Sequence, residues 1–535
     1  MSRGDAPPTT ADRTLVAGEL AGTGTDGGYR LLRAAPGEPH RIRTELAPAR
    51  PHPAGGRVLL RLAHVTDLHV ADPQSPVRLD FAMRVGAGDP AWGGAVDAAF
   101  RPQELLAAHA AASMAETITR LPVDLCVVTG DNLDNAQANE LAAYLAVLDG
   151  GQVGLCPDGR YAGTQSAAWG DDWYWQPEAA DNRYTRRWGY PTIPGLLAAA
   201  ARPFTSRGVG HPWLACAGNH DLLVVGTTAA RAALQPLALA GRKPTRLPDQ
   251  LTDPLETLVT RPQELFAGPT RPVQPHPGRR FIDTGEFVAA HHYLPARPAG
   301  HGFTEQNRRD GTAYYAYDAT EQVRVIVLDT NHPYGHWDGS VDRRQLAWLA
   351  DQLAAAGRPG GPLVILASHH GTGTFDNHRG EAPGERAHAD ELLALALRWP
   401  NVVLWLNGHR HEHRVLGHRR PTGGGLLEVT TAAIMDWPSQ ARLIELAVTE
   451  DGALRVTSTM VDHAAPVNPT GEPDGVGWLA SLHRQLAANE CWRAGRRRAG
   501  SPADRNFIAW FGVPEAPNGR RAFAGRPASV PSSPT

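Results

Sequence analysis

Five short blocks in this chain carry acidic, amide and imidazole side chains of the types that bind divalent metal ions. In chain order they are Asp67-Leu68-His69, Gly130-Asp131-Asn132, Gly218-Asn219-His220-Asp221, Ser368-His369-His370 and Gly408-His409-Arg410-His411. In the first and last blocks two candidate ligands stand at positions i and i+2, which puts both on one face of an extended strand end. Because no thiolate is among them, the donor set suits manganese, iron or zinc and not a structural zinc site built from Cys. The blocks therefore predict a metal-dependent hydrolase.

Apolar runs predict the strands that position these blocks. The runs cover residues 58–65, 123–128, 325–328, 363–366 and 402–406. They are rich in Val, Ile and Leu with little alternation, as expected for strands that are buried on both faces of a sheet covered by helices. Ligand sites in open α/β sheets lie at the carboxyl ends of the strands. We therefore expect an α/β fold in which the blocks meet at one edge.

Two helices are expected between the strands. One covers residues 102–120 and leads into the strand that ends near Asp131. The other covers residues 341–356, where Leu349 and Leu353 recur at helical spacing and predict an apolar stripe against the sheet. Gly357 is expected to end this second helix as a left-handed cap residue.

The ordered series D-x-H, G-D-x, G-N-H-D, H and G-H-x-H resembles the calcineurin-like metallophosphoesterase superfamily, which includes purple acid phosphatases and many phosphodiesterases. The resemblance implies a four-layer α/β/β/α sandwich with cap insertions and a site for two divalent metal ions. The ligands that it implies are Asp67, His69 and His411 for the first ion, Asn219, His369 and His409 for the second, and Asp131 for both.

The resemblance also implies a catalytic role for His220, which would face the substrate and donate a proton or a hydrogen bond to it. Asp221 would orient His220. Bound metal ions lower the pKa of water from ~15.7 toward ~7, which supplies a metal-bound hydroxide for in-line attack on a phosphomonoester or a phosphodiester. The sequence contains neither a G-x-S-x-G elbow nor a Walker-type phosphate loop that would indicate a competing scheme.

Three assignments stay open in the sequence. His370 adjoins His369, and the first His after the strand fits the family better as the ligand. Asp134 follows Asp131 closely and would either orient a ligand or cap a helix. The alternative to an enzyme is a non-catalytic protein of the same fold whose metal site shapes an interaction surface. The presence of Asp131, Asn219 and His220 favours the enzyme.

The spacing of the blocks predicts one catalytic domain with insertions, because the gaps exceed what one strand and one helix need. The expected parts are an N-terminal extension with edge strands at 1–56, a catalytic domain at 57–450, insertions at about 71–100, 150–207 and 222–322, and a C-terminal extension at 451–535 that is mobile from about 514. We expect the insertions to cap the metal site.

The second insertion is rich in aromatic side chains. They are Trp169, Trp173, Tyr174, Trp175, Trp188 and Tyr190. Beside Arg183 and Arg186 they could stack on a base and bind phosphate at the mouth of the site. We favour the interpretation that they pack the insertion onto the core, since most aromatic clusters do so. The basic run Arg496 to Arg498 is likewise interpreted as a solvated patch.

Composition bounds the partners. A net charge of −3, from 52 basic and 55 acidic residues, gives no general attraction to nucleic acid, so a small phosphoester is the expected substrate. No apolar segment has the pattern of a secretory signal or the length of a membrane span, which predicts a cytoplasmic protein. The four cysteines show no C-x-x-C spacing and indicate no disulfide framework.

Overall fold

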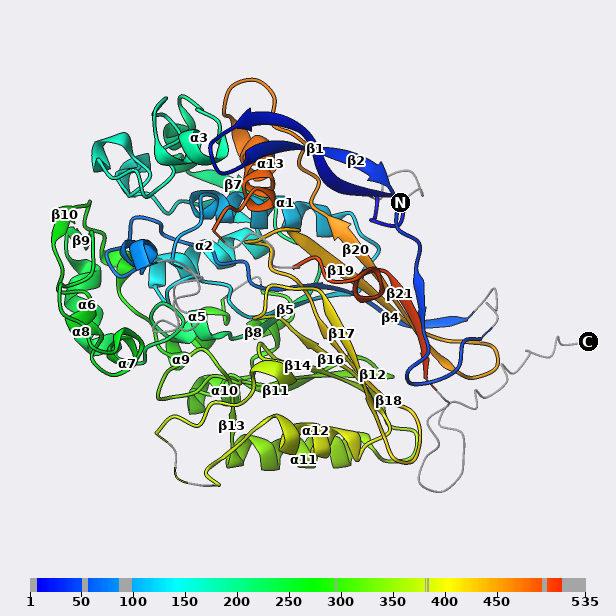
Figure 1. The fold of residues 1–535 in the computed structure, drawn as a ribbon. Helices are drawn as coiled ribbons and strands as arrows, with labels where there is room; N and C mark the ends of the chain where they lie inside the picture. Colours follow the sequence, from blue (N-terminus) through cyan, green and yellow to red (C-terminus); the bar gives the residue numbers. More distant parts are fainter. Residues whose placement is uncertain are drawn as a thin grey trace, which may run out of the picture.

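The computed structural model describes residues 7–50, 56–85, 99–293, 296–380, 382, 384–492 and 498–511. Part of the first insertion, Arg496, Arg497 and the segment from 514 onward lie outside these residues, as does the expected mobility of that segment. Two large sheets form the centre of the molecule (Figure 1). Within the described part of the chain, no helix combines the length and the apolar character needed to cross a membrane.

The first large sheet has seven strands and carries three of the five blocks. Its strands, in spatial order, are β3 (Arg41–Arg43), β21 (Phe507–Phe511), β20 (Leu454–Asp462), β19 (Gln440–Val448), β4 (Arg57–Val65), β5 (Leu125–Thr129) and β8 (Trp213–Cys216). β4, β5 and β8 are parallel neighbours, so the blocks that follow them meet at one edge. β3, β20 and β21 come from the two terminal extensions, which therefore complete the core sheet.

The second large sheet has six strands and carries the last two blocks. Its strands, in spatial order, are β11 (Tyr315–Thr320), β12 (Val323–Val327), β14 (Leu363–Ala367), β16 (Val402–Asn407), β18 (Gly425–Thr430) and β17 (Arg414–Arg419). The four middle strands are parallel, and the two edge strands pair antiparallel with them.

Helices cover the outer face of each sheet (Figure 1). The seven-stranded sheet is covered by α1 (Ala107–Thr119), α2 (Ala138–Asp149) and α13 (Gly475–Ala488), and the six-stranded sheet by α11 (Arg343–Ala356) and α12 (Ala389–Leu397). The four-layer α/β/β/α sandwich predicted from the resemblance is confirmed. The left-handed cap predicted at Gly357 is wrong: its φ is −77°, and its N–H instead bonds to the carbonyl oxygen of Leu353.

The apolar core fills the space between the sheets. In β14, Ile365 belongs to the cluster shared by both sheets, whereas Leu366 belongs to the cluster beneath α11 and α12. Successive side chains of a strand point to opposite faces. The strand therefore needs apolar residues at every position, which explains why the sequence shows a continuous apolar run and no alternation.

The insertions share a second apolar cluster of their own. It joins Phe81 of the first insertion, Trp175 of the second and Phe266 of the third to Leu482 of α13. The smaller helices of this part of the chain are α3 (Arg183–Trp188), α4 (Leu196–Ala201), α5 (Asn219–Leu222), α6 (Arg231–Leu239), α7 (Pro254–Thr260), α8 (Pro262–Leu265), α9 (Thr284–Ala290) and α10 (Glu305–Asp310), and α14 (Pro502–Arg505) lies near the C-terminus.

Short strand pairs complete the fold. They are β1 (Arg13–Thr23) with β2 (Gly28–Pro36), β6 (Gly151–Val153) with β7 (Phe204–Ser206), β9 (Arg242–Pro244) with β10 (Thr270–Pro272), and β13 (Val341–Asp342) with β15 (Arg386–Ala387).

The burial pattern predicts where the chain tolerates truncation. Leu446→Ala in β19 removes a side chain that is 0% exposed, whereas Leu20→Ala in β1 removes one that is 47% exposed. We expect Leu446→Ala to lower the free energy of unfolding by about 2–5 kcal/mol and Leu20→Ala to change it by less than about 0.5 kcal/mol. Denaturant unfolding with a chelator present measures both; equal effects would contradict the assigned core.

Candidate metal centre

The five blocks meet at the carboxyl ends of β4, β5, β8, β14 and β16. The first and last blocks are not the extended strand ends that their i and i+2 spacing predicts, because their candidate ligands follow the strands in loops with positive φ. The non-glycine residues with positive φ in these blocks are Asp67 (52°), His69 (43°), Asp131 (49°), His409 (67°) and His411 (53°). Hydrogen bonds between the loops stabilise this backbone, since the N–H groups of Asp67 and His69 donate to the carbonyl oxygens of Gly130 and Asp131, both at 2.9 Å.

Two block glycines are required because the loops approach closely. A Cβ atom at Gly218 would lie 2.3 Å from both the backbone N and Oδ1 of Asp131. A Cβ atom at Gly408 would lie 2.4 Å from Oδ2 of Asp67. Both separations are far shorter than a van der Waals contact, so a larger residue would push the candidate ligands apart.

The first group of candidate ligands consists of Asp67, His69, His411 and Asp131. The Nε2 atoms of His69 and His411 lie 3.2 Å apart, and Nε2 of His411 lies 3.2 Å from Oδ1 of Asp67. Oδ2 of Asp131 lies 3.7 Å from Nε2 of His69. The four side chains therefore direct nitrogen and oxygen atoms toward one point, as a metal ion requires.

The second group consists of Asp131, Asn219, His369 and His409. Oδ2 of Asp131 lies 3.1 Å from Nε2 of His369, and this nitrogen lies 3.2 Å from Nδ1 of His409. Nδ1 of His409 lies 3.2 Å from Oδ1 of Asn219. Asp131 thus faces both groups with the same oxygen atom, and the structure brings together all seven ligands predicted from the sequence.

The hydrogen bonds of the first group show that its ring nitrogens suit a cation. Nδ1 of His69 donates to Oδ1 of Asp134 at 3.0 Å, and Nδ1 of His411 donates to Oδ2 of Asp436 at 2.7 Å. Burial lowers the pKa of both His69 and His411 to about 4, so both rings are neutral at pH 7. Each Nε2 then presents a lone pair to the other. Two facing lone pairs beside a carboxylate are unfavourable unless a cation lies between them.

His369 and His370 differ in what their ring nitrogens contact. Nδ1 of His369 donates to the carbonyl oxygen of Thr129 at 2.8 Å, which leaves Nε2 directed at Asp131. Both nitrogens of His370 face other partners, the Thr330 hydroxyl at 2.7 Å and the Trp337 carbonyl oxygen at 2.8 Å. The geometry therefore favours His369 over His370 as the ligand.

His220 lies beside the first group, but Asp221 does not orient it. Nδ1 of His220 donates to the carbonyl oxygen of Asp134 at 2.6 Å. The carboxylate of Asp221 instead accepts hydrogen bonds from the backbone N–H groups of Asn132, Leu133 and Gly218, at 2.9, 2.8 and 2.7 Å. The expectation that Asp221 orients the His220 ring is thus corrected: this carboxylate fixes the loops that carry Asp131 and Asn219.

The electrostatic environment keeps Asp131 charged. Burial raises the pKa of this carboxyl group, but the neighbouring His369 and His220 rings outweigh it and hold the pKa well below its usual range. Burial lowers the pKa of His369, but the Asp131 carboxylate outweighs it and raises the pKa to about 9. An ionised carboxylate is what a site for two cations needs at its centre, because it reduces the repulsion between them.

Sequence analysis missed Asp436, which lies in the loop after β18 and orients His411. Its segment, residues 434–438, has no spacing relation to the five blocks, so no local signal marks it. Of the two roles left open for Asp134, the structure favours the first, since Asp134 accepts a hydrogen bond from the ring of the candidate ligand His69, and the N-cap residue of α2 is Gln137.

The interpretation of the basic run as a solvated patch is wrong for Arg498. Its side chain is 13% exposed and forms an ion pair with Asp436.

Most aromatic side chains of the second insertion pack inside the protein. Trp169, Tyr174, Trp175 and Tyr190 are buried in the cluster that the insertions share. Trp173 is partly exposed, and the Arg183 guanidinium lies 3.9 Å above its ring. The four buried side chains therefore serve packing, as expected, but they pack the insertions against one another and α13 and not onto the cluster between the sheets.

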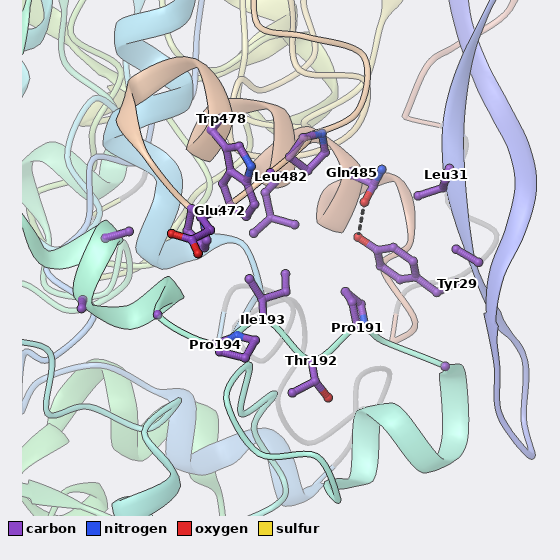
Figure 2. A pocket seen from close by; sticks show the side chains of 18 of the residues that line it. Tyr29, Leu31, Pro191, Thr192, Ile193, Pro194, Glu472, Trp478, Leu482 and Gln485 are labelled. Carbon is purple, nitrogen blue, oxygen red and sulfur yellow. Dashed lines mark hydrogen bonds between the residues drawn. The ribbon is translucent and has the colours of Figure 1, made fainter.

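A cavity of about 860 Å³ lies between the β1–β2 hairpin, residues 189–202 and α13 (Figure 2). Its walls include Tyr29, Ile193, Trp478 and Leu482, and the Tyr29 hydroxyl donates to Oε1 of Gln485 at 2.9 Å (Figure 2). None of the candidate metal ligands lines this cavity. The apolar space is therefore separate from the metal centre.

Comparison with known proteins assigns the family. The family model described as calcineurin-like phosphoesterase matches residues 60–413, which is more than half of the 535 residues. The chain belongs to this family. Family membership supports a hydrolase that acts on phosphoesters at a site for two divalent metal ions. No curated protein matches the chain.

The chain is also similar, at low identity, to several solved structures. A dimetal phosphatase from Danio rerio is 11% identical, with a TM-score of 0.36, and the match covers 76% of this chain and 100% of that one. PhoD is 12% identical, with a TM-score of 0.29 and coverage of 86% and 82%. A putative 5'-nucleotidase from Staphylococcus aureus is 12% identical, with a TM-score of 0.30 and coverage of 79% and 57%.

The raised pKa of His369 predicts that the protein releases a proton when it binds metal. His369, with a pKa of about 9, is protonated at pH 7 in the metal-free protein, whereas His69 and His411 are neutral. Because metal must displace the proton of His369, we expect release of about one proton at pH 7 and tighter binding as the pH rises toward 9. Calorimetric titration with Mn²⁺ in buffers of different ionisation enthalpy measures this; equal heats would contradict it.

Proposed function

We propose that this protein hydrolyses small phosphoesters at a dinuclear metal centre. The observation that carries the proposal is the position of Asp131, whose Oδ2 faces Nε2 of His369 at 3.1 Å and Nε2 of His69 at 3.7 Å. An oxygen atom in this position can contact an ion held by either group, as a bridging ligand between two neighbouring ions does. A site for one ion would need only one of the two groups.

The proposal assigns every donor to one ion or to both. Asp67, His69 and His411 would hold the first ion, Asn219, His369 and His409 the second, and Asp131 both. When bound, two divalent ions supply the Lewis acidity that activates a water molecule and neutralises the phosphoryl oxygens. Manganese, iron and zinc all accept this set of carboxylate, amide and imidazole donors.

The amide of Asn219 is oriented for this role. Its Nδ2 donates to the carbonyl oxygen of Gly226 at 2.8 Å. The amide oxygen Oδ1 is thereby turned toward His409, at 3.2 Å from Nδ1. Gly226 belongs to the third insertion, so that insertion fixes the orientation of one candidate ligand.

His220 is proposed as the proton donor to the leaving group. Because its Nδ1–H is committed to the carbonyl oxygen of Asp134, only Nε2 can exchange a proton with a substrate. The His220 ring packs edge-on against the His69 ring, with centroids 4.7 Å apart, so it lies within reach of a phosphoryl group held at the first position. A positioned acid of this kind contributes about 10²–10⁴-fold to the rate.

Burial of the centre favours small substrates. Asp67, Asp131, Asn219 and His369 are at most 2% exposed. A phosphomonoester or a phosphodiester with one small substituent can reach such a site more readily than a nucleic-acid duplex. We therefore retain a small phosphoester as the proposed substrate.

The test is hydrolysis of a chromogenic phosphomonoester and a chromogenic phosphodiester by protein reconstituted with Mn²⁺. We expect turnover of at least one ester, near-complete loss in Asp131→Ala and a loss of about 10²–10⁴-fold in His220→Ala. His40→Ala is the matched control, because its ring bonds the Thr459 hydroxyl at 2.8 Å, outside the centre.

The outcomes separate the enzyme from a binding protein. Activity that is unchanged in Asp131→Ala would contradict the dinuclear mechanism. Stoichiometric metal binding without cleavage of any ester, across a broader phosphoester panel, would instead favour a non-catalytic protein whose metal site shapes an interaction surface.

A further inference from the structure

We propose that Arg498, in the C-terminal extension, is a positioning residue for the first metal position and acts through Asp436 on His411. The inference rests on the proposed dinuclear function and concerns residues beyond 413, where the match to the family model ends. It would make the C-terminal extension a part of the metal centre.

The carboxylate of Asp436 contacts side chains from three other segments of the chain. Its Oδ2 accepts the Nδ1–H of His411 at 2.7 Å and forms an ion pair with Nη1 of Arg498. Its Oδ1 lies 3.1 Å from Nε of Arg101 and accepts a hydrogen bond from Nε2 of Gln103 at 3.3 Å. Asp436 and Arg101 are each only 3% exposed, so solvent screens these charges little.

Arg498 shares the carboxylate oxygen that orients the ligand ring. Its Nη1 lies 3.3 Å from Nδ1 of His411, so both nitrogens converge on Oδ2 of Asp436. A charged hydrogen bond of this kind is short and strong and therefore fixes the position of the carboxylate. Among the contacts of the described residues, loss of Arg498 would leave Oδ2 of Asp436 with the His411 ring, and that ring would lose part of its fixed orientation.

The segment that carries Arg498 is attached to the strand that follows the last block. The carbonyl oxygen of Arg498 accepts the His413 N–H at 2.8 Å, and Oδ1 of Asp504 accepts the Val415 N–H at 2.9 Å. A Cβ atom at Gly500, where φ is 62°, would lie 2.1 Å from the carbonyl oxygen of His413. This close approach places Arg498 against the His411 loop and not in solvent.

The second metal position does not use this arrangement. Nδ1 of His369 donates to the carbonyl oxygen of Thr129, and Nδ2 of Asn219 donates to that of Gly226, both at 2.8 Å. Neither contact involves Asp436 or Arg498. A change at Arg498 should therefore weaken one metal equivalent and spare the other, which a general loss of structure would not do.

The experiment is a calorimetric titration of the metal-free full chain with Mn²⁺. For the wild type we expect two equivalents to bind. For Arg498→Gln we expect one equivalent to bind as in the wild type and the other about 10–100-fold more weakly, as when a group that orients a metal ligand is removed. Asp436→Asn should weaken the same equivalent, and Arg498→Lys should recover part of the affinity because it keeps the charge but not the planar fork.

Arg61→Gln is the matched control, since Arg61 forms an ion pair with Glu445 at 2.9 Å, away from the candidate ligands. The melting temperature of each metal-free variant reports folding independently. Unchanged binding of both equivalents in Arg498→Gln would overturn the proposal, as would equal weakening of both together with a lower melting temperature. A wild type that binds fewer than two equivalents would overturn the dinuclear function itself, which is a distinguishable result.

Discussion

The centre depends on one buried carboxylate that is kept ionised. Asp131 lies between two groups of candidate ligands, and its Oδ1 also accepts a hydrogen bond from the backbone N–H of His220 at 2.8 Å. An ionised group at this depth is costly unless hydrogen bonds and opposite charges surround it. Because Gly218 has no side chain, the loop after β8 can approach Asp131 closely. Asp221 holds this loop to the loop after β5, since its carboxylate accepts backbone N–H groups from both. The parallel strands bring these loops together.

The core sheets supply the rigidity that the ligand loops need. Asp67, His69 and Asp131 have positive φ, a conformation that costs of order 1–3 kcal/mol per residue. Asp and His tolerate it better than most side chains. The loops keep it because each follows a strand that is buried on both faces, such as β5, whose five residues are all buried. The packed sheet edge therefore keeps the strained loops in place, and the ligand atoms of these loops lie close together.

The sequence predicted the candidate ligands because each stands within a few residues of the strand that positions it. Loop and strand are local in the chain, so a short pattern contains both. Asp436 and Arg498 could not be predicted in this way, since each acts on His411 across a long sequence separation and neither has a fixed spacing from the blocks. Asp221 was assigned to His220 because the two are neighbours in sequence, but the helical turn of α5 directs the two side chains to different partners.

The two proposed metal positions differ in what supports their candidate ligands. At the first position both His rings are backed by carboxylates, Asp134 and Asp436, and each carboxylate is paired with an arginine. Arg78 comes from the first insertion and Arg498 from the C-terminal extension, so segments outside the core strands reach this position. At the second position His369 is backed by the carbonyl oxygen of Thr129, at the end of β5. Both kinds of partner fix the orientation of a His ring, but a carboxylate also carries a charge, which its own neighbours can modulate. Changes in the first insertion or the C-terminal extension can therefore alter how His69 and His411 are held, whereas the orientation of His369 depends on the end of β5.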